Sequence, residues 1–232
     1  MNAASPLPLL LLRPQPGNDA SAARARALGL SVVQVPLFEI APVPPAPVPE
    51  GPFDALLVTS ANGARFGSAL LRARADLPLY AVGPATARAL REVGRADAVV
   101  GGGDAASTAP LIVAAGHRRI LHVGAAETRP FDPLGLTILR HVVYRAVERE
   151  DTAVRPMLDG LAQAVAAIHS PRAGARFAAL IGAARRGDFH IAAISAAAGA
   201  TCGEGWASLA VSSAPDDTAL LACAEALCIR AR

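Results

Sequence analysis

The sequence contains no lysine, so all 22 of its basic residues are arginine. This absence excludes Schiff-base catalysis through a lysine amine and the lysine of a phosphate-binding P-loop. Aromatic residues make up only 4% of the chain and hydrophobic residues 53%, so the core must be mainly aliphatic. The net charge is only +3 and the arginines are dispersed, unlike the clustered basic and aromatic residues of nucleic-acid-binding proteins. Small anionic molecules fit this composition better as ligands than nucleic acid does.

Cysteines and long apolar runs are scarce as well. The three cysteines, Cys202, Cys223 and Cys228, have neither zinc-site nor CxxC spacing, and the five histidines show no metal-ligand spacing. The apolar run Leu9–Leu12 is too short to span a membrane and lacks the flanks of a signal peptide. We therefore expect a cytoplasmic protein with no metal site and no membrane contact.

Two stretches of the chain nearly repeat each other. Phe53–Arg65 and Leu161–Arg176 each contain an apolar run, then a serine (Ser60 or Ser170), a short polar turn, and Gly-Ala-Arg at the start of an expected helix. This order is typical of a strand and the helix that follows it in a parallel sheet. Because such sheets bind ligands at the carboxyl ends of their strands, two ligand-binding edges are expected. Neither serine has the G-x-S-x-G context of a hydrolase nucleophile.

Strands and helices are expected to alternate along the rest of the chain. Expected strands are Leu9–Leu12, Val32–Val35, Ala55–Thr59, Leu79–Val82, Ala98–Val100, Ile120–Val123, Val142–Tyr144, Ala164–Ile168, Ile191–Ile194 and Leu209–Val211. Helices are expected between most of them, including one near Gly63–Arg74 and one near Leu134–Leu139. The pattern predicts an α/β protein with doubly wound parallel sheets.

Two segments interrupt this alternation and are predicted to be linkers. One holds seven prolines between Pro36 and Pro52, and the other is charged. The 35 residues before the first linker cannot bury a stable core alone. The halves Leu9–Ala115 and Arg119–Cys228 repeat one order of elements, so we predict that each half's first strands pack with the other half's last ones. The predicted division is a discontinuous α/β domain of 1–35 plus 152–232, linkers at 36–52 and 143–151, and an inserted α/β domain at 53–142.

Short motifs at the strand ends carry a resemblance to a known family. They are Arg13-Pro14, Pro36–Ile40, Val58–Asn62, Ala81–Ala87, Val143-Tyr144 and Ser170-Pro171. In their order and spacing they resemble the uroporphyrinogen-III synthase family over nearly the whole chain. The resemblance implies two flavodoxin-like domains, each with a doubly wound parallel sheet, joined by a two-stranded β linker, with the active site in the cleft between them.

The resemblance also implies an activity. Enzymes of this family are hydro-lyases of tetrapyrrole (haem) biosynthesis, which cyclise hydroxymethylbilane to uroporphyrinogen III with loss of water and inversion of the last pyrrole ring. They need no metal or organic cofactor. The spontaneous reaction closes the ring without inversion, and a hundredfold preference requires only about 2.7 kcal/mol. Positioning of the substrate can supply that difference, so the absence of a strong acid–base pair does not count against the activity.

Candidate site residues follow from the matching positions. Tyr144 matches the family's linker tyrosine and is the candidate catalytic residue, because a phenol can donate a hydrogen bond to the departing hydroxyl. The candidate substrate-binding residues lie in strand-end turns and offer guanidinium, hydroxyl or backbone N–H groups to the eight substrate carboxylates; they are Arg13, Ser60, Ala61, Asn62, Gly83, Thr86, Arg129 and Ser170. The simpler alternatives are helix capping for the hydroxyl residues, solvated surface charge for the two arginines, and strand packing for Tyr144.

One turn departs from the family pattern. Where the family has Gly-Pro-x-Thr in its second copy, this chain has Ser195–Ala198, so we expect the inserted domain to hold more of the substrate than the discontinuous one. Alternative functions are a non-catalytic two-lobed module that binds a small anionic ligand, and a degenerate synthase-like protein kept for another purpose. We expect a monomer that makes transient contact with hydroxymethylbilane synthase.

Overall fold

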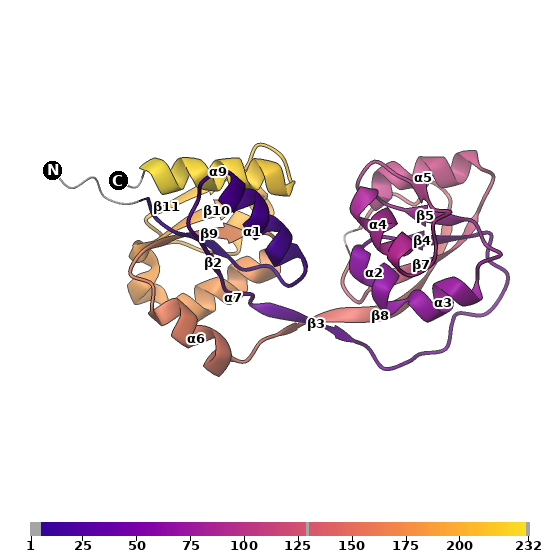
Figure 1. The fold of residues 1–232 in the computed structure, drawn as a ribbon, viewed down its shortest axis with the longest axis horizontal. Coiled ribbons are helices and arrows are strands. Elements are labelled where there is room, and N and C mark those ends of the chain that lie inside the picture. Colours follow the sequence, from indigo (N-terminus) through magenta and orange to yellow (C-terminus); the bar gives the residue numbers. More distant parts are fainter. Residues whose placement is uncertain (1–5, 129, 231–232) are drawn as a thin grey trace. The chain divides into compact units, whose positions relative to one another are not determined.

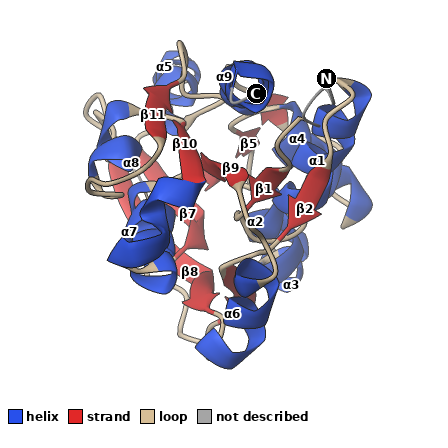
Figure 2. Cartoon of the chain, turned by 90° about the vertical axis from the view of Figure 1, so that its left-hand side faces the viewer, coloured by secondary structure: helices blue, strands red, loops and turns tan. Residues whose placement is uncertain are grey.

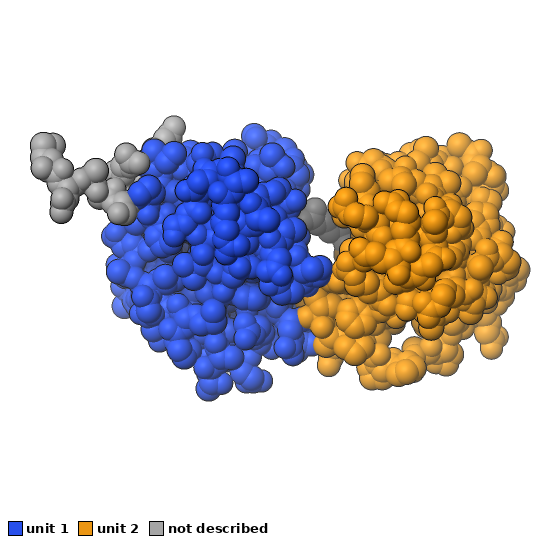
Figure 3. All heavy atoms as spheres, viewed as in Figure 1, with its two compact units in different colours: residues 1–39, 147–232 blue, residues 40–146 orange. Residues whose placement is uncertain are grey.

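The computed structural model describes residues 6–128 and 130–230. The chain divides into two compact units: unit 1 is Met1–Glu39 with Val147–Arg232, and unit 2 is Ile40–Ala146 (Figure 3). Unit 1 is therefore discontinuous in sequence, and the chain passes between the units twice. The linker boundaries predicted above stay predictions.

Unit 1 contains a parallel sheet with strand order β11-β10-β9-β1-β2 among its described residues. Its elements are β1 (Leu9–Leu11), α1 (Gly17–Ala27), β2 (Val32–Gln34), α6 (Asp151–Asp159), β9 (Ala164–Ile168), α7 (Pro171–Ile181), the 3₁₀ helix η1 (Ala183–Asp188), β10 (Phe189–Ala193), α8 (Ala196–Ala200), β11 (Ser208–Val211) and α9 (Asp217–Arg230).

Helices cover both faces of this sheet, α1 and α9 on one face and α7 and α8 on the other (Figure 2). That cover explains why the central strands are continuous apolar runs and do not alternate with polar residues. Every residue of Leu9–Leu12 and of Ala164–Ile168 is fully buried. Three aromatic residues of unit 1 meet beside this sheet, where the ring of Phe177 in α7 stacks on Trp206 and contacts Phe189 edge-on.

Unit 2 contains the second sheet, with strand order β3-β8-β7-β4-β5-β6 among the described residues (Figure 1). Its elements are β3 (Phe38–Pro42), β4 (Ala55–Val58), α2 (Ala61–Phe66), α3 (Ser68–Ala73), β5 (Leu79–Ala81), α4 (Pro84–Glu92), β6 (Val99–Val100), α5 (Ala105–Ala114), β7 (Arg119–Ala125) and β8 (Thr137–Glu148). The first residues of β3 belong to unit 1.

The side chains of β4 show how this second sheet is buried on both faces. Leu56 and Val58 pack into a cluster with residues of α2, α3 and α4. Ala55 and Leu57, which point to the opposite face, pack into a separate cluster with residues of α5. Successive strand residues point to opposite faces, so an uninterrupted apolar strand requires a hydrophobic layer on each side.

The two sheets have one pattern, which confirms the predicted fold class. In unit 1 the order β2-β1-β9-β10-β11 joins two strands from the start of the chain to three from its last part. In unit 2 the order β8-β7-β4-β5-β6 joins two strands from the second half to three from the first. Each half therefore gives its first two strands to one sheet and its last three to the other. β3 pairs beside β8, as a two-stranded linker requires.

Two local predictions were wrong. The helix expected near Leu134–Leu139 is a turn followed by the start of β8, because the positive φ angles of Leu134 (51°) and Gly135 (80°) are incompatible with a helix there. The single helix expected near Gly63–Arg74 is divided into α2 and α3 at Gly67. A Cβ at Gly67 would lie 2.5 Å from a methyl carbon of Val123, so the close approach of β7 requires glycine at that position.

Arg95 connects the end of α4 to the turn after α3 and gives a test of unit 2 packing. It is 3% exposed, and its guanidinium donates to the carbonyls of Leu71, Arg74 and Leu77 and to both oxygens of Asp97. We expect Arg95→Met to lower the free energy of unfolding by about 3 kcal/mol or more, because three carbonyls each lose a hydrogen bond from the buried guanidinium. Urea unfolding followed by circular dichroism measures this loss.

The matched control is Asp97→Asn, because the Asp97 side chain is 53% exposed and the substitution leaves all three carbonyl contacts of Arg95 in place. The amide oxygen can still accept from the guanidinium, so the expected loss is smaller, about 1–2 kcal/mol. Equal losses for the two variants would contradict the assigned role of the carbonyl contacts.

Candidate functional site

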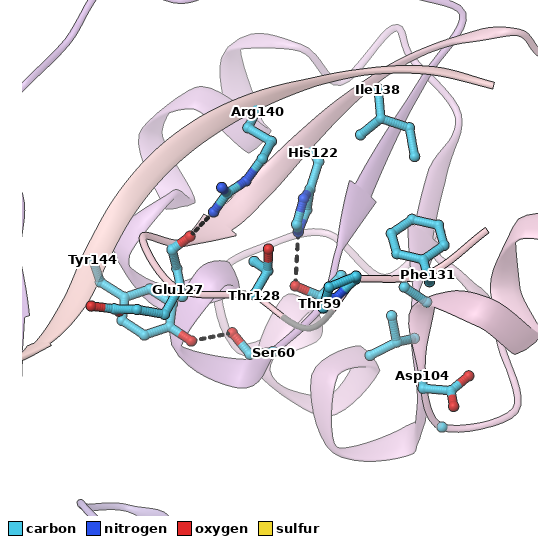
Figure 4. Close-up of a pocket in the computed structure, with 15 residues that line it drawn as sticks. Thr59, Ser60, Asp104, His122, Glu127, Thr128, Phe131, Ile138, Arg140 and Tyr144 are labelled. Carbon is cyan, nitrogen blue, oxygen red and sulfur yellow. Dashed lines mark hydrogen bonds between the residues drawn. The ribbon is translucent and has the colours of Figure 1, made fainter. Parts of the chain in front are cut away.

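A pocket of about 470 Å³ lies at the carboxyl ends of β4 and β7 in unit 2 (Figure 4). These neighbouring strands come from different halves of the chain, and strand order reverses between them, which is where doubly wound sheets bind ligands. The lining residues are Thr59, Ser60, Val82, Gly103, Asp104, Ala105, His122, Ala125, Glu127, Thr128, Pro130, Phe131, Ile138, Arg140 and Tyr144.

The hydroxyl groups of Ser60 and Tyr144 form one hydrogen-bonded pair in this pocket. Their oxygens, Oγ and Oη, are 2.9 Å apart (Figure 4). Ser60 is the N-cap of α2, and its Oγ also accepts the backbone N–H of Gly63 at 2.9 Å. Ser60 therefore caps a helix and contacts Tyr144 at the same time.

Tyr144 is held in place by burial. Its side chain comes from the long strand β8, the residue is 9% exposed, and its ring stacks on Phe66 with centroids 5.8 Å apart. Burial raises the pKa of Tyr144 above its usual value, and the negative charge of Glu127 raises it further, against the lowering effect of the Ser60 hydrogen bond. The phenol therefore keeps its proton at neutral pH and remains a hydrogen-bond donor.

Thr59 and His122 form the second polar pair of the pocket, with 2.8 Å between Oγ1 and Nε2 (Figure 4). His122 is 4% exposed, and burial together with the nearby charge of Arg140 lowers its pKa to about 4. The imidazole is therefore neutral at physiological pH. A Cβ at Gly124 would lie 2.8 Å from His122 Nε2 and 3.2 Å from Thr59 Oγ1, so glycine at that position leaves space for the pair.

Arg140 positions the loop that forms one wall of the pocket. Its Nη2 donates to the carbonyl oxygens of Ala125 at 2.6 Å and Ala126 at 2.7 Å. Ala126 N also donates to the carbonyl of Tyr144 at 2.9 Å. The loop after β7 is thus fixed from β8 at two points, next to Glu127 and Thr128.

The sequence-based candidates in unit 2 lie around these pairs. Ser60 and Tyr144 line the pocket, while Ala61 and Asn62 occupy the first turn of α2. Gly83 is the N-cap residue of α4, and Thr86 lies in the first turn of that helix with 4% exposure. Arg129 lies outside the described residues.

The two candidates in unit 1 lie at the corresponding strand ends of the other sheet. Arg13 follows β1 and makes an ion pair with Asp217, 3.1 Å from Nη1 to Oδ1. Ser170 caps α7, and its Oγ accepts the N–H of Ala173 at 3.2 Å. The backbone angles of Ser60 (φ −163°, ψ 157°) and Ser170 (φ −161°, ψ 157°) are nearly equal, which matches the internal repeat.

Sequence reasoning assigned no role to five polar residues of the pocket: Thr59, His122, Glu127, Thr128 and Arg140. A histidine inside an apolar strand is usually a structural residue, and only the pairing of β4 with β7 places His122 opposite Leu57 and next to Thr59. Over the part of the chain that the structure describes, no group of three or more His, Cys, Asp or Glu residues is arranged to hold a metal ion. The same part contains no helix long and apolar enough to cross a membrane.

The lowered pKa of His122 predicts a loss of stability in mild acid. Between about pH 6.5 and 4 the unfolded chain binds a proton at this residue and the folded chain does not, so stability falls as pH falls through that window. In the wild type this protonation should lower the free energy of unfolding by about 2–3 kcal/mol between pH 7 and pH 4.5. We expect His122→Gln to lack this part of the pH dependence. Urea unfolding at a series of pH values measures it.

His117→Gln, which replaces a histidine outside the pocket lining, is the matched control. A pH dependence of stability that is the same in His122→Gln and in the wild type would contradict the assignment of a proton-free imidazole to His122.

Comparisons with known proteins identify the family. The family model described as "Uroporphyrinogen-III synthase HemD" matches residues 19–222. No curated protein is significantly similar to the chain. A solved mutant uroporphyrinogen III synthase from Thermus thermophilus is 18% identical, with a TM-score of 0.49, covering 97% of this chain and 100% of that one. The wild-type protein from the same organism is 19% identical, with a TM-score of 0.40 and coverage of 96% and 97%.

The family assignment depends on the family model, because it spans most of the chain. The expected substrate is accordingly a linear tetrapyrrole. This chain belongs to the uroporphyrinogen-III synthase family, lyases of haem biosynthesis that cyclise hydroxymethylbilane to uroporphyrinogen III.

Proposed function

We propose that the pocket of unit 2 binds the reacting part of hydroxymethylbilane and that Tyr144 assists the departure of its hydroxyl group. The observation that supports this role most directly is the 2.9 Å contact between Tyr144 Oη and Ser60 Oγ within the pocket. It joins the tyrosine expected from the family resemblance to a residue of a strand-end turn that occupies the ligand-binding edge of the sheet.

The direction of that hydrogen bond follows from the role proposed for Tyr144. A phenol that donates to the departing oxygen cannot donate to Ser60 with the same proton, so Ser60 must be the donor of the pair. Ser60 Oγ can do so because it already accepts the Gly63 N–H, and its own proton remains for Tyr144. Donation from Ser60 makes the phenol more acidic and its proton a better donor.

The reaction then needs little further chemistry from the protein. The C–O bond of the hydroxymethyl group breaks with its electron pair on oxygen, and the Tyr144 hydroxyl stabilises that oxygen. The carbon left behind bonds to the substituted α carbon of the last pyrrole ring and gives a spiro intermediate. The bond from that α carbon to its original methylene bridge then breaks and re-forms at the free α carbon of the ring, which inverts the ring. The proton that this ring loses on closure balances the hydroxide, so the net loss is water. Tyr144 suits this role because it is largely buried. Bulk water therefore does not compete for its hydroxyl proton, and its hydrogen bond to the departing oxygen is stronger than it would be in water.

The substrate's carboxylates require separate contacts. We propose that the first turns of α2 and α4 supply them through backbone N–H groups and the side chains of Ser60, Asn62 and Thr86, at the turns that begin with Ser60 and Gly83. Ala61 contributes its backbone. Arg13, Arg129 and Ser170 remain proposed carboxylate-binding residues; the partner of Arg13 in this structure is Asp217.

The cellular location, oligomeric state and protein partner of the enzyme are also proposals. We propose a cytoplasmic monomer that receives its unstable substrate through transient contact with hydroxymethylbilane synthase. The support is indirect: the absence of paired cysteine spacing in the sequence and the spontaneous closure of free hydroxymethylbilane to the wrong isomer, which favours rapid transfer.

Replacement of Tyr144 tests the catalytic proposal. We expect Tyr144→Phe to slow formation of uroporphyrinogen III by about tenfold to a hundredfold, because the departing oxygen loses its donor. The uninverted type I isomer should increase in proportion, since released substrate closes spontaneously. The measurement supplies hydroxymethylbilane made in situ by its synthase and separates the product isomers.

The chain offers a matched control because it contains only two tyrosines. Tyr80→Phe removes the other phenol, which is also buried but lies outside the pocket lining, and should leave the isomer ratio unchanged. A Tyr144→Phe enzyme that folds and retains the wild-type rate would remove Tyr144 from the mechanism. A folded wild-type protein that yields type I product alone would contradict the family activity itself.

A further inference from the structure

Unit 1 contains a carboxylate surrounded by donors at the strand ends that correspond to the pocket of unit 2. The carboxylate belongs to Asp217, the first residue of α9. Its Oδ1 accepts from Arg13 Nη1 at 3.1 Å, Ser21 Oγ at 2.7 Å and His169 Nε2 at 2.8 Å, and its Oδ2 accepts from Arg24 Nε at 2.9 Å and Nη2 at 2.7 Å. Two oxygens of a carboxylate offer about four acceptor positions, so these five contacts fill them.

The surroundings of this carboxylate are those of an anion site rather than of a surface ion pair. Ser21 is fully buried, and the side chains of His169 and Asp217 are 10% and 15% exposed. Arg24 is half-exposed, and it donates through Nε and Nη2 to the same oxygen, Oδ2, so two N–H groups of one guanidinium converge on it. Burial alone would raise the pKa of Asp217, but the hydrogen bonds from His169, Ser21 and Arg24 hold that pKa well below its usual value.

The internal repeat shows what occupies the same position in unit 2. Asp216 caps α9 by accepting the N–H of Ala219 at 2.9 Å, and Asp104 caps α5 by accepting the N–H of Ser107 at 2.8 Å. Each cap follows an edge strand, β11 in unit 1 and β6 in unit 2, and is followed by the first residue of the helix. That residue is Asp217 in unit 1 and Ala105 in unit 2. Ala105 lines the open pocket, whereas Asp217 reaches across to the donors.

We propose that Arg13, Ser21, Arg24 and His169 form a second carboxylate-binding site, located in unit 1, whose resident ligand is the side chain of Asp217. The site suits a small monocarboxylate. Asp217 is part of α9, so the effective concentration of its carboxylate at these four donors is high. An external carboxylate therefore binds only where the Asp217 side chain is absent or displaced. A substrate acid group therefore reaches Arg13 only by displacing Asp217.

Chemical rescue tests this assignment. We expect Asp217→Ala to lose thermal stability, because two arginines are left close together without their counter-charge. Sodium acetate should restore the unfolding temperature of this variant with a saturable dependence in the millimolar range, and sodium chloride of equal ionic strength should not. The matched control is Asp216→Ala, which removes the neighbouring carboxylate and the cap of α9 but leaves the donors around Asp217 occupied. It and the wild type should each unfold at the same temperature in acetate as in chloride.

A second variant assigns the effect to these donors. Arg24→Gln in the Asp217→Ala background removes the two-nitrogen contact and should weaken the apparent affinity for acetate by at least about tenfold. If Asp217→Ala is unfolded in chloride, folding on addition of acetate is the expected result. The proposal is overturned if Asp217→Ala responds equally to both salts, if it stays unfolded in both, or if the control gains as much from acetate. All these measurements are made without substrate. A negative result would therefore overturn the carboxylate site of unit 1 and leave the role proposed for Tyr144 untouched.

Discussion

The pairing of β1 with β9 and of β7 with β4 joins strands from opposite halves of the chain, and the rest of the structure depends on it. Leu9 pairs with Val165, and Ala55 with Ile120. The strand order reverses at each of these two pairs, so the ligand-binding edge of each sheet is made where the halves meet. Neither half of the chain can form such an edge alone, because each half supplies only one of the two strands in each central pair.

The two edges then differ in how they treat negative charge. In unit 2 the helix after the edge strand β6 starts with alanine, and the space at the strand ends is a pocket lined by the hydroxyl pair and by a neutral histidine. In unit 1 the equivalent helix starts with Asp217, whose carboxylate already pairs with Arg13 and Arg24. One repeated scaffold therefore has a pocket at one edge and an internally paired carboxylate at the corresponding edge of the other sheet.

Much of this arrangement was predictable from local patterns. Apolar runs between turn residues predicted the strands, and the repeated serines predicted helix caps at Ser60 and Ser170, because both signals depend on neighbours in sequence. Contacts such as Ser60 with Tyr144, 84 residues apart, and Arg13 with Asp217, 204 residues apart, depend on sheet register. No local pattern contains that register, and only the family resemblance indicated Tyr144. The helix wrongly expected near Leu134 was an error of another kind, because Asp132-Pro133 followed by Gly135 is a turn signal that should have outweighed its few apolar residues.

The exchange of strands between the halves also has a consequence for synthesis of the chain. When β1 and β2 leave the ribosome, the strand that will cover the other side of β1 has not been made, and Ala164–Ile168 follows only after unit 2 is complete. At ordinary elongation rates the delay is on the order of ten seconds. Unit 2 is continuous in sequence and can fold during that time. The apolar run Leu9–Leu12 has no β9 to pair with until then. The nascent chain thus carries an apolar strand without its β9 partner until unit 2 has been made.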